Sequence, residues 1–197
     1  MDMKPLQTSR TSEHDIAPWI LHRWSPRAMS GEKVDEKELM SLFEAARWAP
    51  SSYNAQPWRF LYARKGTPHW QTFFNLMGDF NKQWTIHADV LLVMISKKTF
   101  EHNNKPSVTH RFDTGAAWEN LALEGSRRGL VVHGMEGFDY EKARKDLNIP
   151  DDYDVEAMAA VGKPGKKESL PPPMQEREVP STRKPLSELI IEGPFQA

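Results

Sequence analysis

The sequence of 197 residues contains no cysteine. This excludes disulfides, thiolate metal sites and cysteine nucleophiles, and it is compatible with the reducing cytoplasm, where we expect the protein. Basic residues are not in excess, because 26 Lys and Arg face 27 Asp and Glu, so we expect no nucleic-acid partner. The longest apolar run, residues 90–95, is too short to cross a bilayer, and the polar opening of the sequence does not resemble a signal peptide. We therefore expect no membrane partner.

Several catalytic signatures are also absent. The glycine-rich patterns of dinucleotide and P-loop sites, the GxSxG nucleophile motif and HxxxH metal-binding pairs do not occur. His133 lies between apolar residues and is expected to be an interior histidine. We expect no metal site and no catalytic side chain, which indicates that a cofactor carries the chemistry.

The composition indicates a globular chain, because apolar residues make up 39% and charged residues 27%. Hydrophobic periodicity predicts helices at 15–22, 36–48, 70–77, 109–128 and 139–147, and strands at 58–64, 89–96, 130–135 and 155–162. Asp35 and Asp139 are expected as N-caps, and Glu38 as the capping-box partner of Asp35. Residues 78–84 are expected as a loop. This order predicts an α+β or α/β fold with one sheet flanked by helices.

The ends of the chain differ in composition from the middle. Residues 1–14 are expected to be a flexible tail, 15–162 the folded domain, and 163–197 a C-terminal arm. Five prolines between 163 and 180 predict an extended segment that does not pack as a core. The arm regains apolar residues at 183–191, so its end is expected to dock on this subunit or on a partner.

A polar elbow, residues 49–60 (APSSYNAQPWRF), joins a predicted helix to a predicted strand. Its Pro50, Ser51, Ser52 and Asn54 stand between two apolar elements, where loops commonly carry binding groups. We interpret the elbow as one wall of a site for a planar cofactor. Its serines are expected to bind a ligand rather than act as nucleophiles.

Basic residues near both ends could bind an anion. Arg23 and Arg27 flank Ser25 in one turn, and Arg183 lies in the arm. The turn suits a phosphate group, although a solvated basic turn is an open alternative.

A second candidate ligand-binding segment follows a predicted strand and consists of Met135, Glu136 and Gly137. Backbone amides at such a strand end often face a ligand, and a simple turn remains the alternative.

Several motifs occur in a fixed order along the chain. They are RWSPR at 23–27, the elbow at 49–60, Asn81 with HADVLLVMIS at 87–96, AAWENLALEGSRRGLVVHGMEGF at 116–138, MAAVGKP at 158–164 and RKPLSELI at 183–190. Over residues 15–192 they resemble the nitroreductase family of flavin-dependent oxidoreductases. The resemblance implies an α+β nitroreductase-like fold with a central, mostly antiparallel sheet flanked by helices. It also implies an entwined homodimer with an extended C-terminal arm, and FMN bound in each interface groove.

The resemblance also assigns roles by position. Arg23 and Arg183, with Ser25, would bind the FMN phosphate, and Arg27 would face the ribityl chain and the pyrimidine edge. The elbow residues would reach the flavin from the partner subunit, Asn81 would approach its pyrimidine side, and the 135–137 turn would adjoin N5. The residues expected to bind FMN are Arg23, Trp24, Ser25, Arg27, Pro50, Ser51, Ser52, Asn54, Asn81, Met135, Glu136, Gly137 and Arg183.

Two residues depart from the family pattern. Trp24 stands where relatives often have Arg or His, and Trp84 stands where some relatives place a Lys near the flavin.

The activity implied is hydride transfer from NADH or NADPH through FMN to a nitroaromatic, a quinone or a similar acceptor. The alternatives are a flavoprotein of the same fold with other chemistry, such as enone reduction, dehalogenation or azoline oxidation, and a non-enzymatic flavin-binding protein.

Overall fold

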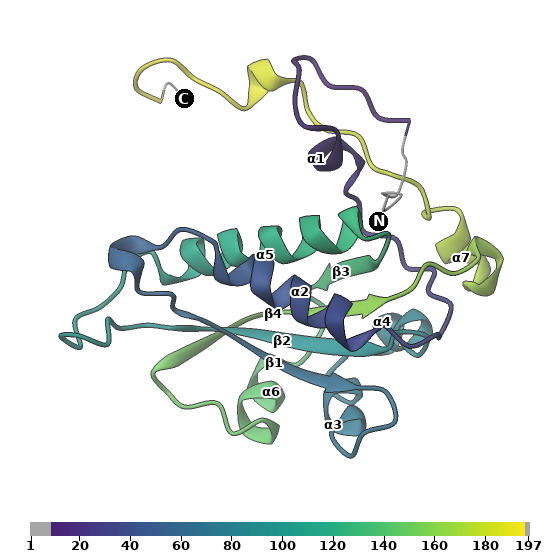
Figure 1. Cartoon of the computed structure of the whole chain (residues 1–197), viewed down its shortest axis with the longest axis horizontal. Helices are drawn as coiled ribbons and strands as arrows, with labels where there is room; N and C mark the ends of the chain where they lie inside the picture. Colours follow the sequence, from purple (N-terminus) through teal and green to yellow (C-terminus); the bar gives the residue numbers. More distant parts are fainter. Residues whose placement is uncertain (1–8, 196–197) are drawn as a thin grey trace.

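The computed structural model describes residues 9–195, and its centre is a four-stranded antiparallel sheet in the order β1-β2-β4-β3. The strands are β1 Trp58–Arg64, β2 Val90–Lys97, β3 Val131–Met135 and β4 Tyr153–Gly162. All four predicted strands are therefore confirmed, and so is the antiparallel α+β architecture (Figure 1).

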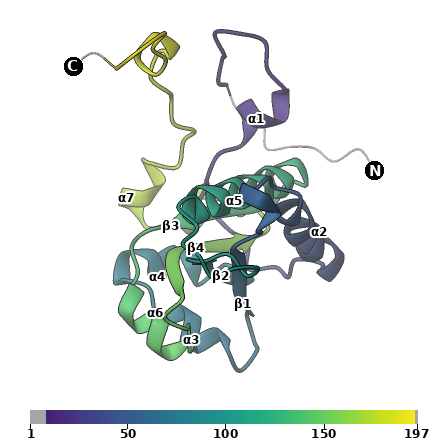
Figure 2. The same ribbon diagram turned by 90° about the vertical axis from the view of Figure 1, so that its left-hand side faces the viewer.

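Helices cover both faces of the sheet (Figures 1 and 2). One layer contains α2 (Glu36–Arg47) and α5 (His110–Arg127), and the opposite layer contains α3 (Trp70–Phe74), α4 (Asp79–Thr85) and α6 (Tyr140–Asp146). The terminal segments add α1 (Pro18–His22) and α7 (Pro172–Gln175). Short 3₁₀ turns occur at Ser52–Asn54, Lys167–Ser169 and Leu186–Glu188. No helix of the described chain is both long and apolar enough to cross a membrane.

Strand β2 lies between two hydrophobic cores, which explains its continuous apolar sequence. Val90 and Leu92 face the core beneath α2 and α5, and Leu91 and Val93 face the core that contains Trp84. These four side chains of β2 and the side chain of Trp84 are fully buried. Each such burial stabilises the fold by about 2 kcal/mol, so this strand anchors the sheet.

Two helix caps form as predicted. The Asp35 carboxylate accepts a hydrogen bond from the Lys37 amide at 2.8 Å, and the Asp139 carboxylate accepts one from the Lys142 amide at 2.8 Å. After α5, Gly129 adopts a φ of 73°, a left-handed conformation that glycine tolerates without a side-chain clash. Local chemistry therefore sets where α2 and α6 begin and where α5 ends.

The loop predicted at 78–84 is wrong, because this segment forms α4. Asp79 and Asn81 favour turns on propensity alone, but Trp84 is fully buried and holds the helix against the sheet. The Trp84 Nε1 donates to Asn81 Oδ1 at 3.2 Å, and Asn81 Nδ2 donates to the Gly137 carbonyl at 3.0 Å. Tertiary contacts thus override the local preference.

The prediction that the proline-rich segment stays extended and unpacked is also wrong for its first part. Leu170 and Met174 are buried, and a short helix begins at Pro172. The buried Glu178 accepts hydrogen bonds at Oε1 from the amides of Arg27 and Ala28, at 2.7 and 2.8 Å. Through these bonds the carboxylate holds the C-terminal arm against residues 23–27, which we call the arginine turn.

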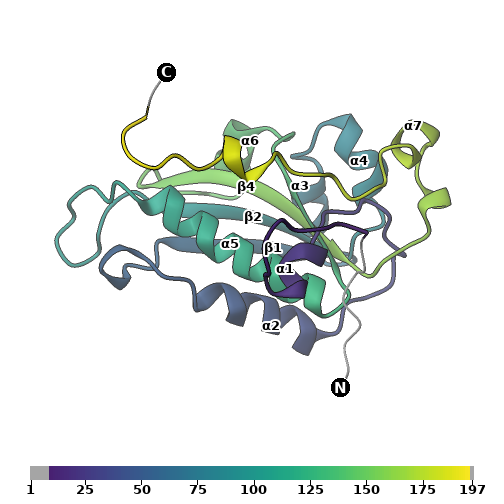
Figure 3. The same cartoon turned by 90° about the horizontal axis from the view of Figure 1, so that it is seen from above.

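The two terminal segments lie on the α5 side of the body (Figures 1 and 3). They contact one another, since the Leu186 amide donates to Glu13 Oε1 at 3.0 Å. Beyond this contact Leu189, Ile190 and Ile191 remain 54–62% exposed. The apolar end is therefore not covered by its own subunit within the described chain, and its docking on a partner stays a prediction.

Candidate functional site

A cavity of about 640 Å³ opens between α5 and the end of the sheet. Four of the expected site residues line it, and they come from the arginine turn and the end of β3. The lining residues are Arg23, Ser25, Met94, Arg111, Thr114, Gly115, Trp118, Glu119, Gly134, Met135, Glu136, Tyr140, Glu156 and Ala157.

The arginine turn places a cation and a hydroxyl side by side on this cavity. Arg23 NH1 donates to Ser25 Oγ at 3.3 Å, and Arg23 Nε lies 3.3 Å from Glu119 Oε1. The Arg23 side chain is only 16% exposed and Glu119 is 48% exposed. A sheltered guanidinium with a solvated counterion can bind a stronger anion such as a phosphate.

The end of β3 forms another wall. The β3–β4 ladder ends at Met135, so the chain at Glu136 leaves the sheet while still lining the cavity. Gly137 does not line it, but its carbonyl accepts hydrogen bonds from the Gly78 amide at 3.2 Å and from Asn81 Nδ2 at 3.0 Å. Asn81 therefore positions the turn rather than reaching the cavity in this chain.

Gly134 brings α5 close to this wall. A Cβ atom at this position would lie 2.9 Å from Trp118 Cζ2, closer than side-chain carbons approach one another. Both residues line the cavity, so the absence of a side chain at Gly134 allows the Trp118 ring to lie against β3 there.

The remaining residues of the turn face elsewhere. Trp24 is half-buried and does not line the cavity. Arg27 does not line it either, and its Nε is buried without a hydrogen-bond partner. An unpaired buried donor is unfavourable, so Arg27 retains capacity for a further acceptor.

His133 is an interior residue, as predicted from the sequence. Its Nδ1 lies 2.9 Å from the Pro26 carbonyl, and its ring centroid lies 4.6 Å from that of Trp84. Burial lowers the pKa of His133 to about 4, against the opposing effect of the Pro26 carbonyl, and the positive charge of Arg27 lowers it further. The imidazole is therefore neutral near pH 7, and its bond to the Pro26 carbonyl holds the backbone of the turn.

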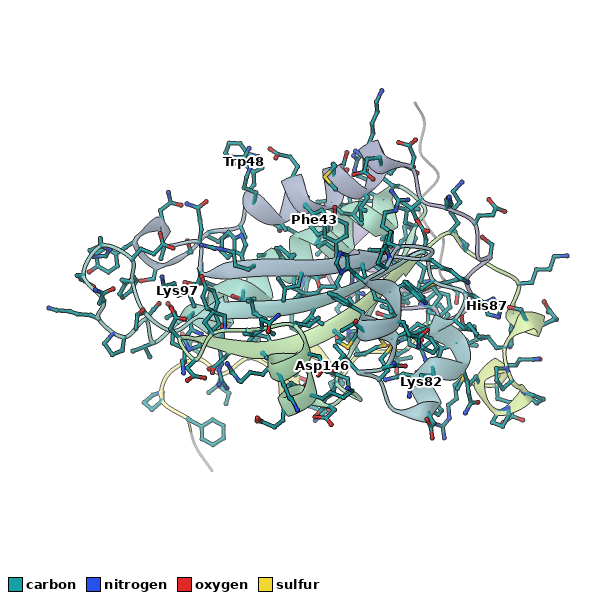
Figure 4. All side chains as sticks on the ribbon, turned by 90° about the horizontal axis from the view of Figure 1, so that it is seen from below. Phe43, Trp48, Lys82, His87, Lys97 and Asp146 are labelled. Carbon is teal, nitrogen blue, oxygen red and sulfur yellow. The ribbon has the colours of Figure 1, made fainter. Side chains whose placement is uncertain are left out.

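The polar elbow does not reach the cavity of its own chain. Pro50 and Asn54 are exposed, Ser51 and Ser52 are half-buried, and none of the four lines it. The preceding Trp48 is 72% exposed and points away from the sheet (Figure 4). The elbow, and Trp48 just before it, thus present side chains outward.

The elbow is nevertheless held in a defined conformation. Tyr53, Asn54 and Gln56 have positive φ values of 51°, 53° and 47°, which are uncommon for residues with side chains. The Ser52 amide donates to Asp113 Oδ2 at 3.0 Å, which ties the elbow to α5. Such strain persists only where surrounding contacts impose it, and it concentrates at functional sites.

Arg183 does not line this cavity but a second one, of about 670 Å³, between the terminal segments. Its NH1 donates to Ser181 Oγ at 3.0 Å. Arg10 connects the two regions, because its NH2 donates to Ser181 Oγ at 3.3 Å and its NH1 donates to the Arg23 carbonyl at 2.8 Å. The sequence did not reveal Arg10, which falls in the expected flexible tail.

A polar cluster next to the cavity also escaped sequence analysis. Ser96 Oγ lies 2.7 Å from His110 Nδ1 and donates to Glu156 Oε1, and Arg111 NH2 lies 2.6 Å from Asp154 Oδ2. Burial raises the pKa of Asp154, but the hydrogen bond and charge of Arg111 outweigh this and lower it. Potential ligand atoms of His110, Asp154 and Glu156 lie within 4.8 Å of one another. Since Arg111 already neutralises Asp154, we interpret the cluster as an ion-pair network.

Comparisons with known proteins show which family and which folds the chain resembles. The model of the Nitroreductase family matches residues 20–69 and 62–163. A crystal structure of an oxidoreductase containing FMN is 42% identical, with a TM-score of 0.92 over 96% of this chain and 98% of that chain. Protein DrgA of Synechocystis sp. is 28% identical over 173 residues, which covers 71% of this chain and 81% of DrgA. A nitroreductase family protein of Clostridium difficile 630 shares the fold, with a TM-score of 0.67 at 20% identity over 88% of this chain and 95% of that chain.

Proposed function

The chain belongs to the nitroreductase family, and on this premise we propose that it is an FMN-dependent oxidoreductase that uses NADH or NADPH to reduce a nitroaromatic, a quinone or a similar acceptor. Support for FMN comes from the similar structure that contains it, at 42% identity. Support for a nicotinamide donor comes from a structural neighbour of Parabacteroides distasonis that is described as a putative NADH dehydrogenase/NAD(P)H nitroreductase.

The observation that carries the proposal is the pairing of two features on one cavity. Arg23 and Ser25 offer a guanidinium and a hydroxyl, and Met135 and Glu136 border the same space of about 640 Å³. This volume lies in the range of small-molecule and cofactor sites. Nearby, the buried and unpaired Nε of Arg27 leaves a donor available. The residues present therefore fit a planar group that carries a phosphate.

In the proposed site, bound FMN would supply the redox chemistry, accepting hydride from the nicotinamide and reducing the acceptor. Arg23 and Ser25 would bind its phosphate, and Arg27 would place positive charge near the site. The chain around Met135 and Glu136 would orient the ring with backbone groups that the ladder leaves available. The protein's contribution is thus binding, orientation and electrostatics, without a side-chain nucleophile.

We also propose a homodimer in which the elbow of one subunit completes the cavity of the other. Support comes from the outward-facing Pro50 and Asn54 and from the strained but anchored backbone at 53–56. The exposed apolar end of the arm, at Leu189 and Ile190, offers further surface for a second copy. Sedimentation analysis of the full chain tests this, and a monomer at micromolar concentration would contradict it.

A visible spectrum of the purified full-length protein tests the function. We expect a flavin absorbance that NADH or NADPH bleaches without oxygen and that a quinone restores. Arg23→Ala should weaken FMN binding by about tenfold, because it removes a charged hydrogen-bond donor from the phosphate. Arg127→Ala is the matched control, since Arg127 pairs with Glu124 on the outside of α5 and does not line the cavity.

The outcomes separate the parts of the proposal. A protein that neither contains nor binds FMN would overturn it. Bound FMN that neither nicotinamide reduces would contradict the proposed donor. Equal FMN affinity in wild type and Arg23→Ala would contradict the phosphate assignment.

A further inference from the structure

Arg10 connects three segments that are far apart in the sequence. Its NH1 donates to the Arg23 carbonyl at 2.8 Å and to the Leu21 carbonyl at 3.4 Å. Its NH2 donates to Ser181 Oγ at 3.3 Å, and the same Ser181 oxygen accepts from Arg183 NH1 at 3.0 Å. One guanidinium thus joins the N-terminal segment, the arginine turn and the C-terminal arm.

The two charged side chains that shift the pKa of Arg10 are both positive. Burial lowers the pKa of Arg10, and the positive charges of Arg183 and Arg23 lower it further, although the guanidinium stays protonated near pH 7. Among the ion pairs of the described chain, Arg23 pairs with Glu119, and neither Arg10 nor Arg183 has a carboxylate partner. The charges of Arg23 and Arg183 thus both repel that of Arg10, and an anion bound among these groups would relieve this repulsion.

Arg10 also retains an unused donor. Its Nε is buried without a hydrogen-bond partner, although both terminal nitrogens are engaged. A second contact supports the same arrangement, because Glu13 Oε1 accepts from the Leu186 amide at 3.0 Å. The N-terminal segment therefore contacts the arm at two points, and of these Arg10 also bonds the backbone of Arg23, which lines the cavity.

Resting on the proposed FMN site, we propose that Arg10 is a positioning residue that fastens the C-terminal arm to the arginine turn, so that Arg183 and Arg23 act on the same phosphate. The hydrogen bonds through Ser181 set the place of Arg183, and the bond to the Arg23 carbonyl sets the place of the turn. The phosphate dianion in turn relieves the repulsion that Arg23 and Arg183 exert on Arg10. The docking of the arm on the arginine turn and the binding of the phosphate therefore favour one another.

Titration of flavin-free full-length protein with FMN and with riboflavin, which lacks the phosphate, tests this proposal. Quenching of flavin fluorescence reports both affinities. Arg10→Ala should weaken FMN binding by about tenfold and change riboflavin binding by less than about twofold. Arg177→Ala removes an exposed arginine of the same arm and should leave both affinities unchanged.

A double-mutant cycle identifies the route of the effect. If Arg10 acts through Arg183, then Arg183→Ala should cost less FMN affinity in the Arg10→Ala background than in wild type. Arg10→Lys restores the charge but not the two-armed bridge, so it should recover only part of the affinity.

The possible results are distinct. If wild-type protein does not bind FMN, the proposed function itself fails. If wild type binds FMN and Arg10→Ala binds it equally well, the function stands and the role of Arg10 is wrong. Equal losses for FMN and riboflavin, full recovery in Arg10→Lys, or additive effects of Arg10→Ala and Arg183→Ala would each overturn the positioning role.

Discussion

The buried His133 predicts a specific dependence of stability on pH. Its Nδ1 must carry a proton, since the Pro26 carbonyl at 2.9 Å can only accept a hydrogen bond. Burial against Trp84 and the nearby charge of Arg27 hold the folded pKa at about 4, below the ordinary value of 6.5. The unfolded chain therefore binds a proton at a pH where the folded protein does not.

The direction and the size of the change in unfolding free energy with pH follow from this difference in pKa. Because the folded pKa is lowered, the stabilising contribution of neutral His133 is complete above pH 6.5 and is lost as the pH falls toward 4. A shift from 6.5 to about 4 corresponds to about 3 kcal/mol in total. About 2 kcal/mol of this should already be lost between pH 7 and pH 5.

Urea denaturation of wild type and His133→Gln at both pH values measures this loss. Glutamine keeps a donor for the Pro26 carbonyl but does not titrate, so the variant should lose about 2 kcal/mol less unfolding free energy than wild type between pH 7 and pH 5. Carboxylates contribute equally to both proteins and cancel in the comparison. An identical pH dependence in the two proteins would refute the reasoning, because it would mean that His133 is protonated in the folded state or that its site opens to water.

Three further substitutions test buried contacts of the fold and of the site. Glu178→Ala should lower the unfolding free energy by about 3 kcal/mol, because two buried amides lose their acceptor; thermal unfolding measures it against Glu178→Gln, which keeps an oxygen acceptor, and an unchanged melting temperature would contradict it. Asp89→Ala should cost about 3 kcal/mol in a urea titration, since the buried carboxylate lies 2.8 Å from Arg64 NH2; a loss below about 1 kcal/mol would show that solvent replaces the pair. Gly134→Ala should displace the Trp118 ring and weaken FMN binding, because the new Cβ would lie 2.9 Å from Cζ2; an unchanged near-ultraviolet tryptophan spectrum would argue against it.

Elements with a strong local signal were predictable from the sequence. The alternation in β1 and the spacing of Leu39 and Leu42 in α2 report burial directly, because the same faces enter the cores. Helix α4 carries no such signal. Its turn-forming residues are held in a helix by Trp84 and by contacts with Gly137, which lies more than fifty residues away in the chain.

The contacts of the candidate site also divide into those that sequence spacing predicts and those that it does not. Arg23 and Ser25 stand two residues apart, so their meeting could be expected from spacing alone. Arg10 reaches Ser181 across 171 positions, a distance at which no sequence pattern indicates contact. The Ser96 and Glu156 pair likewise depends on the register of β2 against β4. Sequence periodicity reports burial well, whereas polar contacts between distant segments depend on the completed fold.

The two parts of the proposed site, the β3 wall of the cavity and the C-terminal arm, are held in place by different contacts. The β3 wall continues a strand whose Val131 and Val132 are buried in the two cores, so its position depends on the stability of the whole domain. The arm that carries Arg183 depends on a few polar contacts, from Glu178 and Arg10, and its side chains beyond these contacts are largely exposed. Segments with few buried contacts open at much lower free energy than the core. A phosphate bound by both Arg23 and Arg183 would therefore stabilise the arm far more than the sheet, which makes the arm the part of the proposed site whose order depends on the cofactor.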